Sequence, residues 1–163
     1  MKKITTILIA LIGFSFNTQA QVNPHALGIR FGGNGYYNDA EISYQLGVGK
    51  KNRFEFDLGI RERKYYNNMS FTGVYHWNWN IVSGLNWYAG PGAAIGLYSW
   101  DDKNNKKQSG ATLALGGQIG LEFDFKKVGA PILLSIDSRP MFDFVGYDRG
   151  FGWGAALGIR YVW

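Results

Sequence analysis

Phe151-Gly-Trp-Gly-Ala-Ala-Leu-Gly-Ile-Arg-Tyr-Val-Trp163 closes the chain, and this stretch decides the fold. Its odd positions are all apolar or aromatic, whereas its even positions carry glycine, alanine, valine and a single arginine, Arg160. Side chains alternate across a β-strand, so the stretch predicts a strand with one apolar face and one face of small residues. Its length, with aromatic residues at both ends of the apolar face, is typical of a strand that crosses a membrane.

The first twenty residues carry the features of a secretory signal peptide. Lys2 and Lys3 precede an apolar run over residues 4–16, and a small-residue ending, Asn17-Thr-Gln-Ala20, follows it. The run is shorter than the roughly 20 residues that a membrane-spanning helix needs, although a retained anchor is the alternative. We therefore predict residues 1–20 as a cleaved signal peptide and residues 21–163 as one domain. Any membrane insertion of that domain has to use a closed barrel, because no other apolar stretch is long enough for a helix.

Composition supports an all-β chain and excludes several classes of function. The sequence has 23 glycines and 17% aromatic residues, which favour strands and tight turns over helices. It has no cysteine, which excludes disulfide frameworks, thiolate metal sites and cysteine catalysis. The net charge of +5 includes two lysines of the signal peptide and is too small to indicate nucleic-acid binding.

The period-2 alternation recurs eight times, over residues 26–33, 40–49, 53–63, 70–81, 85–100, 111–125, 131–144 and 151–163. An even number of strands places both termini on one side. The connections after the first, third, fifth and seventh strands are long and the others are short, which is the habit of outer-membrane barrels with extracellular loops and periplasmic turns. The pattern predicts an eight-stranded antiparallel up-and-down transmembrane β-barrel, with periplasmic termini and the lysine-rich segment 101–110 outside the cell.

Two prolines conflict with regular pairing inside this barrel. Pro91 and Pro140 fall within the fifth and seventh predicted strands. A proline removes a ladder hydrogen bond, and a closed barrel has no edge strand to accommodate it. We predict a bulge or a bend at Pro91, and Pro140 raises the same question near a strand end.

The kind of polar residue on the strands separates a membrane barrel from a secreted lipocalin-like barrel, whose polar face meets water. All ten lysines lie in the signal peptide, turns, loops or strand ends. Arginine, the cation suited to buried carboxylate pairing, occupies the polar face instead. The predicted lumen charge network consists of Arg30, Glu41, Glu55, Asp57, Arg61, Arg63, Glu122, Asp124, Asp137, Arg139, Asp143 and Arg160.

Aromatic residues on the apolar face gather toward the two ends of the strands. This sorting predicts two girdles at the membrane interfaces, with aliphatic residues between them. The predicted periplasmic girdle contains Phe54, Trp79, Trp87, Phe125, Tyr161 and Trp163, and the extracellular girdle contains Phe31, Phe71, Phe144 and Trp153.

The mature chain resembles the small eight-stranded outer-membrane barrels of the OmpA/OmpX type, and more closely the short barrel proteins of the Bacteroidetes. The segments that carry the resemblance are Gly73-Val-Tyr-His-Trp77, Gly84-Leu-Asn-Trp-Tyr-Ala-Gly-Pro-Gly92 and Ala155-Ala-Leu-Gly-Ile-Arg-Tyr-Val-Trp163. The resemblance implies that Tyr161 and Trp163 form a signal for the barrel-assembly machinery, with tryptophan in place of the usual final phenylalanine. It carries over no catalytic residue.

Barrel size limits the functions that remain. The interior of an eight-stranded barrel is just wide enough to be filled by side chains. We therefore predict a monomeric, non-enzymatic barrel without metal or cofactor, in contact with outer-membrane lipid and lipopolysaccharide, with a structural role or a loop-mediated role such as adhesion. A narrow pore is one alternative. A lipid A deacylase or acyltransferase is another, but His25 and His76 are the only histidines and neither begins a His-x-Ser pair; Asn78 stands where the serine would be.

Overall fold

The computed structural model describes residues 22–33, 38–63, 66–101, 107–146 and 149–163. The predicted signal peptide and the tips of the predicted loops lie outside the described residues. The strands are β1 His25–Gly33, β2 Asn38–Val48, β3 Asn52–Arg63, β4 Tyr66–Val82, β5 Leu85–Asp101, β6 Lys107–Asp124, β7 Ile132–Ser138, β8 Met141–Val145, β9 Gly150–Gly152 and β10 Ala155–Val162. One short 3-10 helix, η1 Phe125–Val128, joins β6 to β7. No helix in the described part of the chain is long and apolar enough to cross a membrane.

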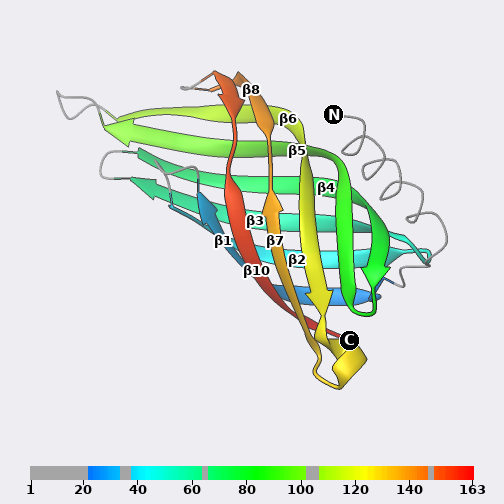
Figure 1. Ribbon diagram of the computed structural model, residues 1–163. Coiled ribbons are helices and arrows are strands. Elements are labelled where there is room, and N and C mark those ends of the chain that lie inside the picture. Colours follow the sequence, from blue (N-terminus) through cyan, green and yellow to red (C-terminus); the bar gives the residue numbers. More distant parts are fainter. Residues whose placement is uncertain (1–21, 34–37, 64–65, 102–106, 147–148) are drawn as a thin grey trace, which may run out of the picture.

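These elements form one closed antiparallel barrel (Figure 1). Successive strands pair from β1 to β7, β8 pairs with β9, and β10 closes the barrel by pairing with β1. β7 and β8 both pair with β6 in the same register, so together they form one barrel strand with an interruption. β10 pairs with β7 and β9 pairs with β8, so β9 and β10 likewise form one interrupted barrel strand. The prediction of eight barrel strands is therefore confirmed.

The stagger of the strands sets the shape of the barrel. Paired residues can be followed once around it from Gly33 through Ala155, Ser138, Ile119, Ala89, Trp77, Asn52 and Val48. The β1–β2 register then places Val48 opposite residue 23, which is ten residues before Gly33 on the first strand. A stagger of ten residues over eight strands corresponds to a strand tilt of about 40°, within the usual range for barrels.

The two ends of the barrel differ. The end with the β2–β3 and β4–β5 turns, η1 and Trp163 is here called the turn end, and the opposite end is called the loop end. At the loop end β4 and β6 begin at Tyr66 and Lys107, four residues earlier than predicted, and the β5–β6 hairpin extends far from the turn end (Figure 1). Part of each predicted loop is therefore strand.

The predicted strand over residues 111–125 ends one residue early, at Asp124. The Asp124 carboxylate accepts a hydrogen bond of 2.9 Å from the backbone N–H of Lys126 and so caps η1. Gly129 ends η1 in the left-handed region, with φ of 93°, which favours glycine. Phe125 is therefore in this turn and not in β6.

Pro91 produces no bulge, so that part of the prediction is wrong. Pairing with β6 continues in one register from Ala89 to Ala93, and the β4–β5 register is the same on both sides of the proline. Gly117 of β6 is paired with Pro91, but its N–H donates to the Pro140 carbonyl, on the side of β6 away from β5. Pro91 and Gly117 are therefore a pair without mutual hydrogen bonds, and the Pro91 nitrogen faces β4. The ladder is accordingly interrupted only on the β4 side, where Tyr75 and His76 do not pair with β5.

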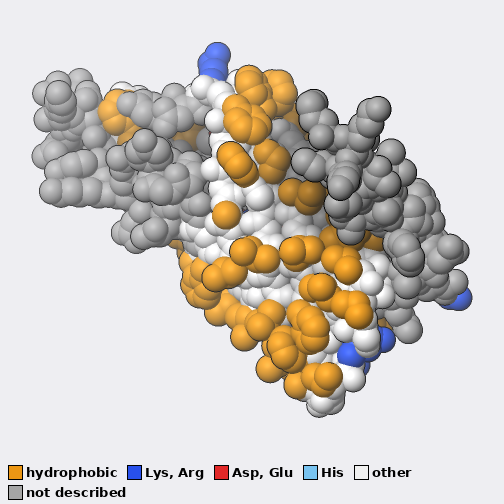
Figure 2. Space-filling model, in the orientation of Figure 1, with side chains coloured by type: hydrophobic (Ala, Val, Ile, Leu, Met, Phe, Trp, Pro, Cys, Tyr) orange, Lys and Arg blue, Asp and Glu red, His pale blue; other side chains and the backbone are white. Residues whose placement is uncertain are grey.

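The apolar faces of the strands point outward and the polar faces point inward. Ile29, Ile42, Leu58, Ile95 and Leu157 are all more than two-fifths exposed, whereas the alternate residues of the same strands are buried or half-buried. Hydrophobic side chains spread over the face of the wall in Figure 2. A soluble protein rarely exposes apolar surface on this scale. The lipocalin-like alternative, which needs the opposite orientation, is excluded.

Candidate functional site

The barrel lumen is the candidate functional site, and Glu55 on β3 lies at its centre. Its carboxylate is fully buried and accepts hydrogen bonds from Gln45 (2.5 Å), Gln118 (3.0 Å), Arg160 (3.1 Å) and Arg139 (3.2 Å). These partners come from β2, β6, β10 and the segment between β7 and β8. One carboxylate of β3 is thus linked to four other strands of the barrel.

Arg139 and Arg30 extend the network toward the loop end. The Arg139 guanidinium forms ion pairs with Asp57 and with Glu41, the latter at 3.2 Å. Glu41 also accepts a hydrogen bond of 2.6 Å from Arg30 Nη1, and Arg30 donates to the Asp137 carboxylate from both Nε and Nη2. Such fork-like arginine–carboxylate pairs are strong and directional.

Arg53 and Glu122 form the part of the network nearer the turn end. Arg53 Nη1 lies 2.6 Å from Glu122 Oε2, and its guanidinium carbon lies 4.6 Å from the centre of the Tyr88 ring. Arg53 Nε donates to His76 Nδ1 at 3.2 Å, so the remaining proton of a neutral His76 is on Nε2. Asn78 donates to the other Glu122 oxygen at 3.5 Å.

A small apolar cluster lies on the turn-end side of these charges. Ala26, Leu133 and Val162 pack together and are almost fully buried. Beside them Asn23 donates to Asp124 at 2.8 Å, which fixes the segment before β1 to the end of β6. The linked charges are thus followed, on the side of β1, β10 and β7, by a small cluster of packed aliphatic side chains.

The structure brings together eight of the twelve residues predicted for the lumen network: Arg30, Glu41, Glu55, Asp57, Glu122, Asp137, Arg139 and Arg160. Asp124 is buried, but it caps η1 and accepts a hydrogen bond from Asn23, so it belongs to the turn end of the barrel and not to the charge network. Asp143 is half-buried on β8. The side chains of Arg61 and Arg63 lie outside the described residues.

Sequence reasoning missed Arg53, which is almost fully buried in the network. It is the first residue of the predicted strand 53–63, directly after the turn at residues 50–52, and the predicted network does not include it. The usable signal was its parity: Arg53 is an odd-numbered residue of the third strand, like Glu55 and Asp57. Gln45, Gln118, Ser43 and Ser135 were also missed, and they supply the neutral hydrogen-bond partners of Glu55 and Arg160.

Among the side chains that the structure describes, the ion-paired part of the lumen holds one carboxylate more than it holds guanidinium groups. Arg30, Arg53, Arg139 and Arg160 face Glu41, Glu55, Asp57, Glu122 and Asp137. Among these acids Asp57 is the least supported, because one of its oxygens is buried without a hydrogen-bond partner. No group of His, Asp or Glu side chains within the described ranges could hold a metal ion.

The histidines do not form a nucleophilic site within the described part of the chain. His76 is fully buried in the lumen, and the nitrogen not bound to Arg53 has no hydrogen-bond partner. His25 lies at the turn end, where its Nδ1 is 2.9 Å from the Tyr44 hydroxyl and its ring stacks on Trp163. Neither ring contacts a serine hydroxyl in the described hydrogen-bond network, so the arrangement lacks the serine–histidine pair of acyl transfer.

The predicted girdle residues all lie on the outer wall. Phe54, Tyr161, Trp163, Phe31, Phe71, Phe144 and Trp153 are exposed, and Trp79, Trp87 and Phe125 are half-buried against one another or against Phe123. On β3 and β4, however, aromatic residues also run along the wall between the ends. Phe56 stacks on Phe71 there, and Tyr75 packs edge-on against Phe54 and Trp77.

The closed barrel, its apolar wall and its polar lumen define the fold of a small eight-stranded outer-membrane barrel. Solved structures of this class are similar to the chain. Neisserial surface protein A is 14% identical, with a TM-score of 0.63 over 85% of this chain and 94% of that one. The N-terminal barrel of OprF from Pseudomonas aeruginosa is 18% identical, with a TM-score of 0.61 over 89% of this chain and 100% of that one.

The attachment invasion locus protein Ail of Yersinia pestis is also similar, at 12% identity and a TM-score of 0.57, covering 85% of this chain and 96% of that one. No protein-family model and no curated protein matches the sequence. The likeness therefore concerns the fold, and the expected resemblance to small outer-membrane barrels is confirmed at that level.

Proposed function

We propose that this chain is a monomeric, non-enzymatic barrel of a Gram-negative outer membrane, with a closed lumen and a function performed by its loop end. The observation that carries the proposal is the lumen itself. Four arginines and five carboxylates are linked across the barrel, and packed Ala26, Leu133 and Val162 lie below them. Such a lumen supports the wall and leaves contacts with other molecules to the loops and the membrane face.

The outer membrane is the location that supports the apolar wall best. Closed barrels are the form in which strands cross a bilayer, because every backbone group pairs within the wall. The short turns would face the periplasm and the loops the cell exterior, as in barrels of this class. On this proposal the partners are membrane lipid and lipopolysaccharide, the barrel-assembly machinery during insertion, and an extracellular partner at the loops.

Orientation can be tested because the natural chain has no cysteine. Arg149→Cys at the loop end and Ser83→Cys in the β4–β5 turn both place a thiol at an exposed position. A membrane-impermeant thiol reagent should label Arg149→Cys in intact cells, and Ser83→Cys only after the outer membrane is opened. The reverse labelling would contradict the proposed orientation, and equal protection of both thiols would contradict the location.

The placement of His76 supports a non-enzymatic role. Its ring is enclosed in the lumen against Arg53 and Tyr88, whereas lipid substrates approach from the wall. Mass spectrometry of lipid A from cells with and without the chain should show identical acyl chains. A difference that disappears in a His76→Gln variant with normal barrel content would support the lipid A enzyme instead.

The loop-mediated role is the finer part of the proposal. Photo-crosslinking from position 149 in intact cells, followed by purification of the barrel, should recover an extracellular or outer-leaflet partner. Crosslinking from Ser83 is the matched control at the turn end. Recovery of partners only from Ser83 would contradict a role performed by the loops.

A further inference from the structure

Four exposed lysines lie at the turn end, in two pairs. Lys50 and Lys51 lie in the β2–β3 turn, and Lys126 and Lys127 lie in η1. All four are exposed, and none takes part in an ion pair of the described network. Asp124, the carboxylate next to η1, is already engaged by Asn23 and by the Lys126 N–H. These lysines are therefore available to an external anion.

The two lysine pairs lie on opposite sides of the barrel. In the order of strands around the wall, the β4–β5 turn lies between them on one side and the β1–β10 pair on the other. Exposed apolar residues mark both intervening positions: Ile81 and Val82 at the β4–β5 turn, and Tyr161 and Trp163 at the end of β10. The pairs are thus two separate cationic positions on an otherwise apolar rim.

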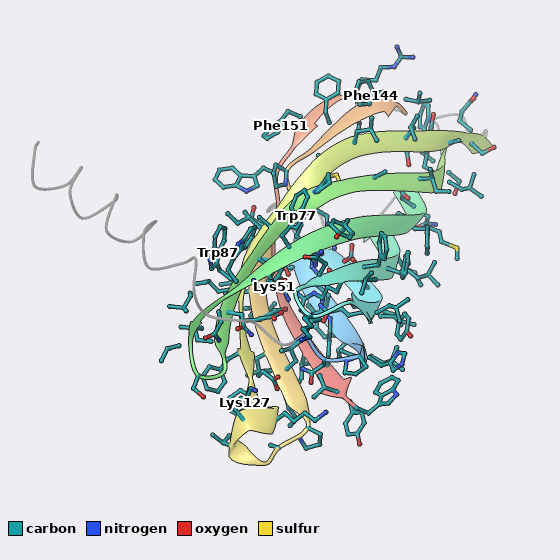
Figure 3. All side chains as sticks on the ribbon, turned by 90° about the vertical axis from the view of Figure 1, so that its right-hand side faces the viewer. Lys51, Trp77, Trp87, Lys127, Phe144 and Phe151 are labelled. Carbon is teal, nitrogen blue, oxygen red and sulfur yellow. The ribbon has the colours of Figure 1, made fainter. Side chains whose placement is uncertain are left out.

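Each lysine pair borders a cluster of aromatic rings on the membrane wall. The backbone carbonyl of Lys51 accepts a hydrogen bond of 2.9 Å from the backbone N–H of Asn78. The next residue, Asn52, is paired with Trp77, whose ring packs against Tyr75. Lys126 and Lys127 follow Phe125, whose ring packs edge-on against Phe123. In Figure 3 Phe144 and Phe151 lie at one end of the barrel and Lys127 lies beside η1 at the other, with Trp77, Trp87 and Lys51 between them.

A cation just beyond an aromatic ring on a lipid-facing wall lies where a bilayer places its phosphate groups. Aromatic rings prefer the boundary between hydrocarbon and head groups, and lysine side chains extend from there to the aqueous side. A lysine near an anionic lipid surface strengthens association by roughly fivefold. Adjacent lysines can share one phosphate, and the neighbouring rings can pack against the first methylene groups of the same lipid.

We propose that the Lys50–Lys51 turn and the Lys126–Lys127 turn are two binding sites for anionic phospholipid in the leaflet at the turn end. The proposal rests on the proposed function in one respect, namely that the chain lies in a membrane. It adds a lipid class and two defined positions. The lysines supply the charge selectivity, and the aromatic clusters hold the acyl chains of the bound lipid.

Native mass spectrometry of the detergent-refolded barrel tests the two sites separately. Wild-type protein should retain two molecules of phosphatidylglycerol in preference to phosphatidylcholine. Lys126→Gln/Lys127→Gln and Lys50→Gln/Lys51→Gln should each lose one of them, with affinity at the altered site lower on the order of twentyfold. The matched control, Lys107→Gln/Arg149→Gln, removes two cations near the loop end and should retain both.

Three results would overturn the proposal. The first is equal retention of phosphatidylglycerol and phosphatidylcholine by the wild type, and the second is unchanged retention by the variant that lacks all four lysines. The third is a lysine-dependent adduct with inorganic phosphate alone, which would assign the sites to a free anion. Insertion into phosphatidylcholine vesicles separates failure of the two lipid sites from failure of the proposed function. A barrel that inserts but shows no lipid preference contradicts the two sites, whereas a barrel that fails to insert contradicts the proposed function.

Discussion

Neutralising two neighbouring acids of β3 should lower the free energy of unfolding by very different amounts. Glu55→Gln replaces a carboxylate that accepts four N–H groups, two of them from arginines, and places an amide N–H₂ among donors. Breaking such a buried charge network from one side costs about 3–5 kcal/mol. Asp57→Asn removes an acid that has one unpartnered oxygen and leaves Arg139 paired with Glu41 and Glu55. Because it also equalises the numbers of paired arginines and acids, its cost should stay within about 1 kcal/mol.

Urea titration of the refolded barrel in detergent micelles, followed by tryptophan fluorescence, measures both free energies of unfolding. Ser135→Ala serves as the control within the same lumen, because it removes a single hydrogen bond from Arg160 and should cost about 1–2 kcal/mol. Equal losses for Glu55→Gln and Asp57→Asn would refute the ranking of the two acids. A larger loss for Asp57→Asn would show that Asp57, and not Glu55, is the centre of the network.

Three further predictions concern the wall, the network and the chain end. Gly90→Ala should abolish folding or cost more than about 4 kcal/mol, because the added Cβ would lie 1.7 Å from the Tyr75 carbonyl oxygen. Gly73→Ala is the control, because its Cβ would lie 3.9 Å from Phe56. The fraction of compact barrel on unheated gels should fall for Gly90→Ala and stay unchanged for Gly73→Ala. Arg53→Met should cost about 3–5 kcal/mol in the same urea assay, because Glu122 loses its ion-pair partner, and a loss below about 1 kcal/mol would exclude Arg53 from the network. Trp163→Ala should cost about 1 kcal/mol through the lost stacking on His25 and lower the amount of assembled barrel in cells, whereas Trp163→Phe should preserve both; equal behaviour of the two variants would exclude an aromatic assembly signal.

The number of strands and the direction of their faces could be predicted because a membrane wall imposes a strict period of two. Ile29 and Arg30 illustrate this: one residue faces outward and the next is buried against Asp137. The end of β6 could not be predicted in the same way, since Phe125 continues the alternation. A local interaction, the cap from Asp124 to Lys126, overrides that pattern.

Pro91 and Arg53 show what alternation leaves out. The effect of a proline depends on which neighbour its nitrogen faces, and the nitrogen of Pro91 faces β4 only, so pairing with β6 continues. Parity could have placed Arg53 in the lumen, but its partner Glu122 is 69 residues away in sequence. Pairings of this kind depend on the stagger of the closed barrel, which no short segment of sequence specifies.

Single-channel recording on the purified barrel in planar bilayers tests the closed lumen most directly. If the proposed closed lumen is right, the wild type should show no stable, reproducible unit conductance, because the linked arginines and acids and the cluster of Ala26, Leu133 and Val162 occupy the narrow interior of an eight-stranded barrel. Unit conductance of constant size, altered by Glu55→Gln or Arg139→Gln, would contradict the closed lumen and identify the chain as a narrow pore.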